Sequence, residues 1–377
     1  MSKEISTRSM TSTKPNAFQR TISVIGADNL SLMFALVIVV LLITVASGWF
    51  GLQGGNMFFS WQNLMNSVAQ AVVVVGLLAV GETVVIIAGA LDISVGSIAS
   101  IGSVVSASVL IGVGAVGSGH ILPTGSVVIA VAAGMVAGMV AGVINGSIVT
   151  VLKVNPIIAT LGTLAAFAGF AFLLAPAGKP IGVFTQPGFT WLAQGRLLTN
   201  LAIPALDRSR WTGIPVLTVI LVIVAILVHI IMRYTDFGRA IYAIGGNATA
   251  ARLAGINISR VRVLMYVLSG GIAGLAGVLL AARTTSGNPI NGVGLELQAI
   301  TAVFLGGAAT AGGKGTIAGT FIAVILVGVL NNGMNLLGFN TFIQQVALGF
   351  LLIAAVAISQ WRQARAESAR TRVDAKG

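Results

Sequence analysis

Residues 67–88 read SVAQAVVVVGLLAVGETVVIIA, and this stretch decides the class of fold. It is apolar almost throughout, and Glu82 is its one ionisable residue. A helix needs about 20 mostly apolar residues to cross the hydrocarbon core of a membrane. The stretch is therefore predicted to be a membrane-spanning helix, and its carboxylate is the first side chain that needs an explanation.

The composition extends this pattern to the whole chain. Of the 377 residues, 56% are hydrophobic and 8% are charged, whereas soluble domains average about 45–50% apolar and about 25% charged residues. Such hydrophobicity excludes a disordered chain. A net charge of +12 would suit a nucleic-acid binder, but the basic residues would have to line a soluble face. We predict an all-α polytopic membrane protein with no nucleic-acid partner.

The chain has few of the residue types that enzymes and metal or cofactor sites use. The chain has no cysteine, which excludes disulfides, thiolate chemistry and cysteine-ligated metals. Its two histidines, His120 and His229, lie far apart in sequence and argue against a histidine-rich metal site. We predict no catalytic, cofactor-binding or metal-binding residue.

Apolar stretches of spanning length recur along the chain and form one transmembrane domain, residues 30–360. The eighth stretch is short and rich in glycine, so its limits are the least defined. We predict about ten spanning helices, at residues 30–48, 67–88, 94–113, 126–152, 157–175, 214–232, 263–282, 297–311, 316–336 and 341–360.

Basic residues set the predicted orientation, because cytoplasmic loops carry an excess of Lys and Arg. Residues 1–29 are polar and precede an apolar run of full spanning length, which favours a cytoplasmic tail over a secretory signal. With that tail inside, 16 of the 21 Lys and Arg residues fall on the cytoplasmic side. An even number of spans also places the C-terminal tail, residues 361–377, in the cytoplasm.

Two parts of the transmembrane domain resemble each other. GVING at 142–146 is followed by VNPII at 154–158, and GVLNNG at 328–333 is followed by FNTFI at 339–343. The predicted fourth and ninth spans that carry these motifs run in opposite directions. An inverted repeat is typical of transporters, and chance similarity between Gly- and Val-rich segments is the alternative.

Glycine has two predicted uses. The run GGAATAGGKGT at 306–316 suggests a phosphate loop, but Gly315 follows Lys314 where a Walker A motif needs Ser or Thr. We interpret this run as a tight turn that holds Lys314 at the cytoplasmic face. Small residues on one helix face let two spans pack closely, and such a face is formed by Gly134, Gly138, Gly142 and Gly146.

Polar residues at membrane depth are the candidates for a solute pathway. Glu82 could be protonated, pair with an arginine or bind substrate hydroxyls, because an intramembrane carboxylate is by default a functional residue. Asp92 and Ser94 are placed to cap the start of the third span. Interhelical hydrogen bonds are the alternative role for the whole set, which consists of Gln70, Glu82, Asp92, Ser94, Asn145, Thr301, Asn332 and Gln344.

The flanks of the seventh and eighth spans hold two further charges, Arg283 and Glu296. Their positions make them candidates for an ion pair at the outer face. A proton-coupled carrier would need such groups to relay charge, and one carboxylate within a span is little support for that chemistry.

The loop at 233–262 contains a helix signature. Asn247 is a good N-cap, Ala248–Ala254 is rich in helix formers, and Gly255 is a natural terminator. We predict a short cytoplasmic helix at this position. An ordinary loop with excess positive charge needs no internal helix, so this feature favours a docking surface.

Four ordered motifs give the chain a family resemblance. They are LDISVGS at 91–97, GRAIYAIGGNATAARLAGI at 238–256, FLGGAATAGGKGTIAGT at 304–320 and NNGMNLLG at 331–338. Through them, residues 55–355 resemble the permease subunits of bacterial monosaccharide ABC importers, of the ribose, xylose and galactose type. Ala90 departs from a more usual glycine, and residues 1–29 match no part of the family.

The resemblance implies a subunit that neither binds nor hydrolyses ATP. Two copies would form the pathway in the inner membrane lipid, a cytoplasmic ABC ATPase subunit would drive it, and a periplasmic sugar-binding protein would deliver the substrate. ATP-driven closure of the ATPase would move a coupling helix and alternate access to the pathway. That helix corresponds to Asn247, Ala248, Thr249, Ala250, Ala251, Arg252, Leu253, Ala254 and Gly255.

Other functions stay open at this point. A permease for branched-chain amino acids or nucleosides has related membrane segments, and an ion-coupled secondary carrier or a channel is a different class. The loop at 233–262 discriminates between them, because a lone carrier or channel does not need it. Whether the two copies are identical, and which sugar is carried, does not follow from the sequence.

Overall fold

The structure is a computed structural model that describes residues 27–50, 58, 60–112, 124–183, 186–199 and 213–374. Most of the predicted N-terminal tail, together with His120, Arg208, Arg210 and residues 375–377, lies outside the described residues. The described chain is helical apart from two pairs of two-residue strands. The prediction of an all-α polytopic membrane protein is confirmed.

Eight helices in the described residues are long and apolar enough to cross a membrane. The second of them, residues 61–87, is continuous from α3 (Trp61–Asn63) through a π-helical turn (Leu64–Val68) into α4. The eight include α2 (Ala27–Phe50), α4 (Ala69–Ile87), α6 (Thr124–Thr150), α7 (Pro156–Leu174), α9 (Val216–Tyr234), α12 (Ile258–Thr284), α14 (Ile317–Leu336) and α15 (Thr341–Asp374).

The third and eighth predicted spans are shorter helices, α5 (Val95–Leu110) and α13 (Leu295–Leu305). The predicted eighth span, 297–311, is wrong at its C-terminal end. The chain turns after Leu305, and Gly307, Gly312, Gly313 and Gly315 all adopt positive φ angles that end a right-handed helix. The expected tight glycine turn is therefore present, and Lys314 is exposed on it.

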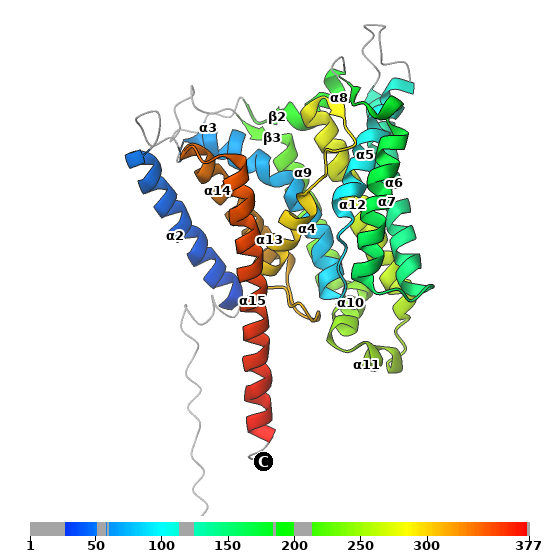
Figure 1. The fold of residues 1–377 in the computed structure, drawn as a ribbon, viewed down its shortest axis with the longest axis vertical. Helices are drawn as coiled ribbons and strands as arrows, with labels where there is room; N and C mark the ends of the chain where they lie inside the picture. The colour runs from blue at the N-terminus through cyan, green and yellow to red at the C-terminus, as the bar shows by residue number, and fades with distance from the viewer. Residues whose placement is uncertain are drawn as a thin grey trace, which may run out of the picture.

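The small elements lie at the two ends of the helix bundle (Figure 1). One end holds α8 (Pro187–Gln194) and two antiparallel strand pairs, β1 (Ile181–Gly182) with β4 (Ser286–Gly287) and β2 (Arg196–Leu197) with β3 (Ile214–Pro215). The other end holds α10 (Asp236–Gly246) and α11 (Ala248–Leu253). The N-terminal end of α2 and the C-terminal end of α15 point to the α11 end as well (Figure 1).

The helices form two groups of opposite direction, which extends the predicted repeat. Each group has the order long, short, long, long: α4 to α7, and α12 to α15. The C-terminal end of α4 lies at the α11 end, where the Gly313 N–H donates to the Ile87 carbonyl, whereas α12 starts at that end directly after α11. Helices α6 and α14 are likewise opposite, and Asn155 and Asn340 accept hydrogen bonds at the starts of the helices that follow them.

Glycine brings α6 and α12 into backbone contact, as the sequence predicts. A Cβ atom built on Gly138 would lie 2.1 Å from the Gly270 carbonyl oxygen, and one on Gly142 would lie 2.2 Å from the Tyr266 carbonyl oxygen. The contact is reciprocal, since a Cβ on Gly274 would lie 2.4 Å from the Gly134 carbonyl oxygen. Close approach of two helix backbones provides dispersion contacts where lipid offers no hydrophobic driving force.

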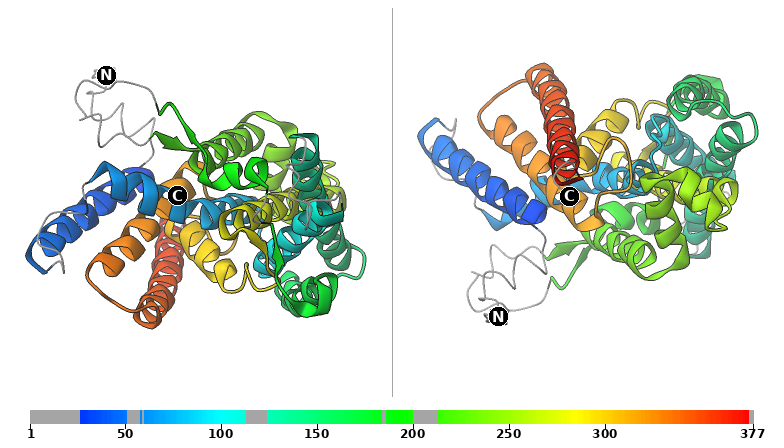
Figure 2. Two further views of the ribbon diagram at one scale, coloured as in Figure 1. Left: turned by 90° about the horizontal axis from the view of Figure 1, so that it is seen from above. Right: turned by 90° about the horizontal axis from the view of Figure 1, so that it is seen from below.

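Burial divides the helices into an inner and an outer set. The spanning window of α4 is 89% buried, whereas that of α2 is 17% buried. Helices α2, α14 and α15 fan out on one side of the bundle (Figure 2). The inner helices α4, α5 and α12 therefore position the polar residues described next.

Candidate functional site

Four of the predicted pathway residues meet in one buried cluster, formed by Glu82, Asp92, Ser94 and Asn145. The Asp92 N–H donates to Glu82 Oε1 at 2.9 Å, so the loop after α4 folds back onto its own helix. Asp92 Oδ1 accepts from the Ser94 N–H at 2.9 Å and from the Ser94 hydroxyl at 2.6 Å. The Asn145 side-chain amide donates to Ser94 Oγ at 2.8 Å. This bond joins α6 to the loop between α4 and α5.

This geometry corrects the predicted helix cap. Ser94 occupies the N-cap position of α5, but its side chain makes no capping hydrogen bond to the helix. The Ser94 hydroxyl donates to Asp92 instead, in the local turn that an Asp followed two residues later by Ser readily forms. Asp92 still lies directly before the first turn of α5, where a carboxylate interacts favourably with the helix dipole.

Within the described part of the chain Glu82 has no cationic partner, which argues against one of its three predicted roles. The single ion pair among the described residues joins Asp236 and Arg239, far from Glu82 in sequence. Four buried polar atoms around the cluster have no hydrogen-bond partner: Glu82 Oε2, Asn145 Oδ1, Tyr266 Oη and Ser269 Oγ. Because all four residues are at most 1% exposed, the cluster is closed to solvent in this conformation.

Beside the cluster, the starts of α5 and α13 face each other. The Gly292 N–H donates to Ser100 Oγ at 3.0 Å, and the Asn291 amide donates to Ser103 Oγ at 2.9 Å. A Cβ on Gly292 would lie 1.9 Å from the Gly96 carbonyl oxygen. The series of turns before α13 therefore packs directly against the α5 backbone at Gly96.

The expected pair of Arg283 and Glu296 does not form. Arg283 Nη1 donates to the Gln70 carbonyl oxygen at 3.3 Å. Glu296 is 8% exposed and its Oε1 accepts from the Gly294 N–H at 3.2 Å. The two residues are separated because the segment between them packs against α5 inside the bundle, which places Glu296 away from the surface.

The four remaining predicted pathway residues make no hydrogen bond to the cluster. Gln70 is partly buried, and its backbone carbonyl accepts from Arg283. The Thr301 hydroxyl donates to the Leu297 carbonyl of its own helix at 2.6 Å. Asn332 exchanges two hydrogen bonds of 2.9 Å with Asn63, and the Gln344 amide donates to Asn335 Oδ1 at 2.7 Å. These three side chains make hydrogen bonds within the helix bundle. Interhelical hydrogen bonds are the alternative that the sequence leaves to a role in the solute pathway.

The predicted short helix exists as α11 (Ala248–Leu253), with the expected ends. Asn247 Oδ1 accepts from the Ala250 N–H at 3.0 Å, as an N-cap does. At the C-terminal end the Ile256 N–H donates to the Ala251 carbonyl at 3.1 Å and Gly255 has φ +84°, which together form a Schellman motif. Ala251 faces a small apolar cluster, while Leu253 is 85% exposed at the tip.

A backbone junction joins α10 to the transmembrane helices, and sequence reasoning missed it. A Cβ on Gly245 would lie 1.8 Å from the Ile87 carbonyl oxygen, and one on Gly312 would lie 2.7 Å from the Gly89 backbone. The Gly313 N–H donates to the Ile87 carbonyl at 2.8 Å. The paired glycines at 245–246 and 312–313 were the available signal, because they mark close approach of backbones.

Tyr242 adds a side-chain bond to this glycine junction. Its hydroxyl donates to the Gly315 carbonyl at 2.9 Å. Partial burial raises the pKa of the Tyr242 phenol, while nearby Arg233 acts in the opposite direction. The phenol therefore stays protonated and keeps its donor role at neutral pH.

Comparison with known proteins decides the family. Residues 63–356 match the family model for the permease component of branched-chain amino acid transport systems. The chain belongs to this permease family.

Curated relatives of the permease include proteins named for the transport of ribose and L-arabinose. The permease is 38% identical to the ribose import permease protein of Bacillus subtilis over 80% of its own length and 86% of the relative. It is 36% identical to an L-arabinose transport system permease protein of Escherichia coli over 79% of its length and 83% of the relative. It is also 37% identical to a probable ABC transporter permease protein of Escherichia coli, over 79% of its own length and 82% of the relative. No solved structure gives a significant match to the chain.

Proposed function

We propose that this permease is the membrane subunit of an ATP-driven ABC importer that moves a monosaccharide into the cytoplasm by alternating access. The names of its relatives, which import ribose and transport L-arabinose, support the substrate class. The partners follow from the same class: a cytoplasmic ABC ATPase, a periplasmic sugar-binding protein, a second permease copy and the surrounding lipid. The proposal includes no nucleic acid and no enzymatic step on this chain.

One observation supports the ATPase partner above all, namely α11 and its exposed tip. In this proposal the ATPase covers Leu253, which is 85% exposed at the tip of this projection. The Schellman motif and the N-cap hold the six-residue helix in shape although it is too short to be stable alone. A carrier that works without an ATPase has no need of such a projection.

The junction described above gives this projection a route into the membrane domain. Movement of α11 displaces α10, because Asn247 links the two helices directly. Gly245 then pushes on the Ile87 carbonyl, since no side chain separates the two backbones. Helix α4 transmits the movement to Glu82. The Glu82 carboxylate accepts a hydrogen bond from the Asp92 N–H, in the loop directly before α5.

The proposed pathway lies where the two opposed helix groups meet. The starts of α5 and α13 are in contact there, through Gly96 and Gly292. Inverted repeats place a substrate path at their interface. Glu82, Asp92, Ser94 and Asn145 border this region, and we propose that they hold its walls, with substrate access arising only when α5 moves.

We propose an inner-membrane location with both chain ends in the cytoplasm. Excess Lys and Arg near the α11 end supports this orientation: Arg233, Arg239, Arg252, Arg260, Arg262 and Lys314 lie in the loops and helix ends around α10 and α11. The ends of α2 and α15 point the same way (Figure 1).

Sugar uptake tests the proposal. The permease would be expressed with a sugar-type ABC ATPase and a sugar-binding protein from the same organism, in cells that lack ribose and arabinose importers. We expect uptake of labelled sugar that persists with a protonophore while ATP is maintained, and that stops when the ATPase lysine of its Walker A motif is replaced. Collapse with the protonophore would indicate a secondary carrier, and uptake of a branched-chain amino acid alone would overturn the substrate class.

A further inference from the structure

A cavity of about 380 Å³ lies at the corner between α9 and α10, next to the start of α14. Its polar walls come from His229, Arg233, Arg239, Tyr242 and Thr316. Two of these five side chains, Arg233 and Arg239, carry positive charge. The cavity lies at the C-terminal end of α9, directly before α10.

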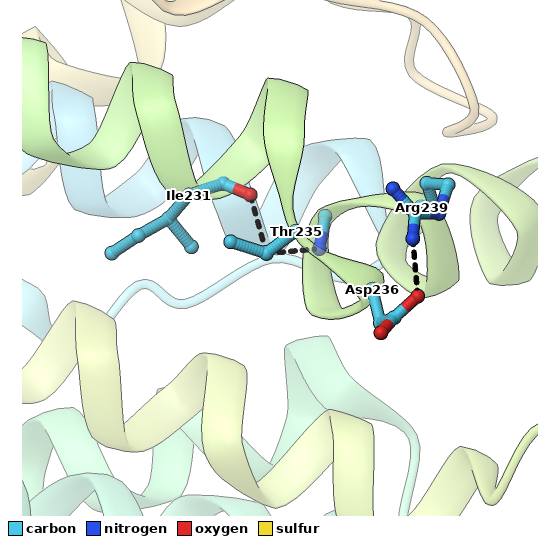
Figure 3. A network of polar contacts seen from close by, with 5 residues as sticks. Ile231, Thr235, Asp236 and Arg239 are labelled. Atoms are coloured by element: carbon cyan, nitrogen blue, oxygen red, sulfur yellow. Dashed lines mark hydrogen bonds and ion pairs between the residues drawn. The ribbon is translucent and has the colours of Figure 1, made fainter.

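The corner is built by local hydrogen bonds (Figure 3). The Thr235 hydroxyl donates to the Ile231 carbonyl at 2.6 Å, and Thr235 Oγ1 accepts from the Gly238 N–H at 3.3 Å. These bonds end α9 and start α10 within two residues, and they place Arg233 and Arg239 on the same side of the turn. These bonds therefore fix the backbone positions from which the two arginine side chains extend.

Positive charge in the cavity exceeds negative charge. Asp236 pairs with Arg239 (Figure 3), and that pair is the one ion pair among the described residues. Arg233 consequently has no carboxylate partner there, and its guanidinium lies 5.9 Å from the centre of the Tyr234 ring. The first turn of α14 adds backbone N–H groups at the positive end of a 20-residue helix.

A second cavity, of about 340 Å³, continues from the first into the membrane domain. The two share His229 and Ile317. The second is lined almost entirely by apolar side chains between α9 and α14, such as Val222, Ile226, Phe321 and Ile322. From His229 to Val222 the groove follows α9 for seven residues, or roughly 10 Å at 1.5 Å per residue.

We propose that these two cavities form one binding site for an anionic phospholipid. The phosphate would bind Arg233, and an acyl chain would follow the groove between α9 and α14. Charge complementarity selects an anionic headgroup, because basic pockets between spanning helices on the cytoplasmic side suit such lipids. The apolar groove selects a lipid over free phosphate, which would leave that groove unfilled. The site lies outside the Asp92 cluster and does not depend on which solute is transported.

Lipid retention by the purified permease tests this site. Native mass spectrometry would compare phosphatidylglycerol with phosphatidylcholine on the wild type and on Arg233→Gln. We expect phosphatidylglycerol to be retained preferentially, and Arg233→Gln to weaken its retention about fivefold. Arg260→Gln is the matched control, because Arg260 is exposed at the same end of the molecule but lines neither cavity.

The groove has its own variant, Ile226→Trp, which fills the apolar cavity without changing charge. We expect it to reduce retention of phosphatidylglycerol while leaving the binding of short-chain analogues unchanged. Equal loss with Arg260→Gln would show general attraction to basic surface and overturn the site. Competition by millimolar inorganic phosphate, with no effect of Ile226→Trp, would show a phosphate site and overturn the lipid assignment.

Discussion

Glu82 receives a hydrogen bond at one carboxylate oxygen from the Asp92 N–H, and its other oxygen has no partner. The sequence identifies this residue as unusual, because a carboxylate inside an apolar span is costly. It does not identify the partner, since Asp92 reaches Glu82 only when the loop after α4 folds back. The same limit applies to Asn145, which lies 53 residues away from Asp92 and joins it through helix packing.

Substitution of Glu82 separates the role of its shape from the role of its charge. Glu82→Gln keeps an oxygen that accepts from the Asp92 N–H, so we expect near-normal thermal stability and sugar uptake. Glu82→Leu leaves that buried N–H without an acceptor, which costs about 1–3 kcal/mol of unfolding free energy. Melting of the purified permease in detergent measures both variants. If Glu82→Gln were as damaging as Glu82→Leu, the carboxylate itself would take part in transport.

At the scale of elements, sequence patterns predict the long helices and α11 well, because each is a local property. Hydrophobic length gives the eight spans, and Asn247 and Gly255 mark both ends of α11. The lengths of α5 and α13 are less predictable. Their limits depend on segments that enter the bundle, such as residues 285–294 beside α5, and those contacts are long-range.

The packing of α6 on α12 is a property of the glycine face. Gly138→Ala would place a methyl group against the Gly270 carbonyl, so the helices must separate, and we expect a loss of about 1–3 kcal/mol from overpacking. Gly162→Ala in α7 is the matched control, because a Cβ there meets nothing within 4 Å. Melting temperatures of the two purified variants make the comparison. Equal melting temperatures would contradict the close contact of α6 and α12.

The coupling role of α11 depends on its helical form. Ala251→Pro removes the N–H that donates to the Asn247 carbonyl at 2.9 Å, so we expect uptake to stop while the permease stays in the membrane. Ala248→Pro is the control, because proline is tolerated at the first position of a helix, and Asn247 already has the extended conformation that precedes proline. Uptake and membrane content are measured together. Normal uptake by Ala251→Pro would remove the coupling role from α11.

At the scale of the whole molecule, two inverted groups of helices share one end at which α10, α11 and the glycine turn meet. The repeat motifs at 142–146 and 328–333 indicate the inversion, but its extent over α4 to α7 and α12 to α15 appears only in the fold. The paired glycines at 245–246 and 312–313 indicate close backbone contacts, but not that these contacts meet at Ile87, because the three segments are distant along the chain. We expect this end of the permease to contact the ATPase.

Site-directed cross-linking tests this contact. Because the permease has no native cysteine, each introduced cysteine is the only thiol in the permease. Leu253→Cys, at the tip of α11, and Lys179→Cys, in the loop that leads to β1 at the opposite end, would each be labelled with a photo-activated cross-linker in membranes holding the whole importer. We predict that Leu253→Cys links to the ATPase subunit and that Lys179→Cys does not. Linkage of the ATPase to Lys179→Cys, with none to Leu253→Cys, would contradict both the docking surface and the orientation.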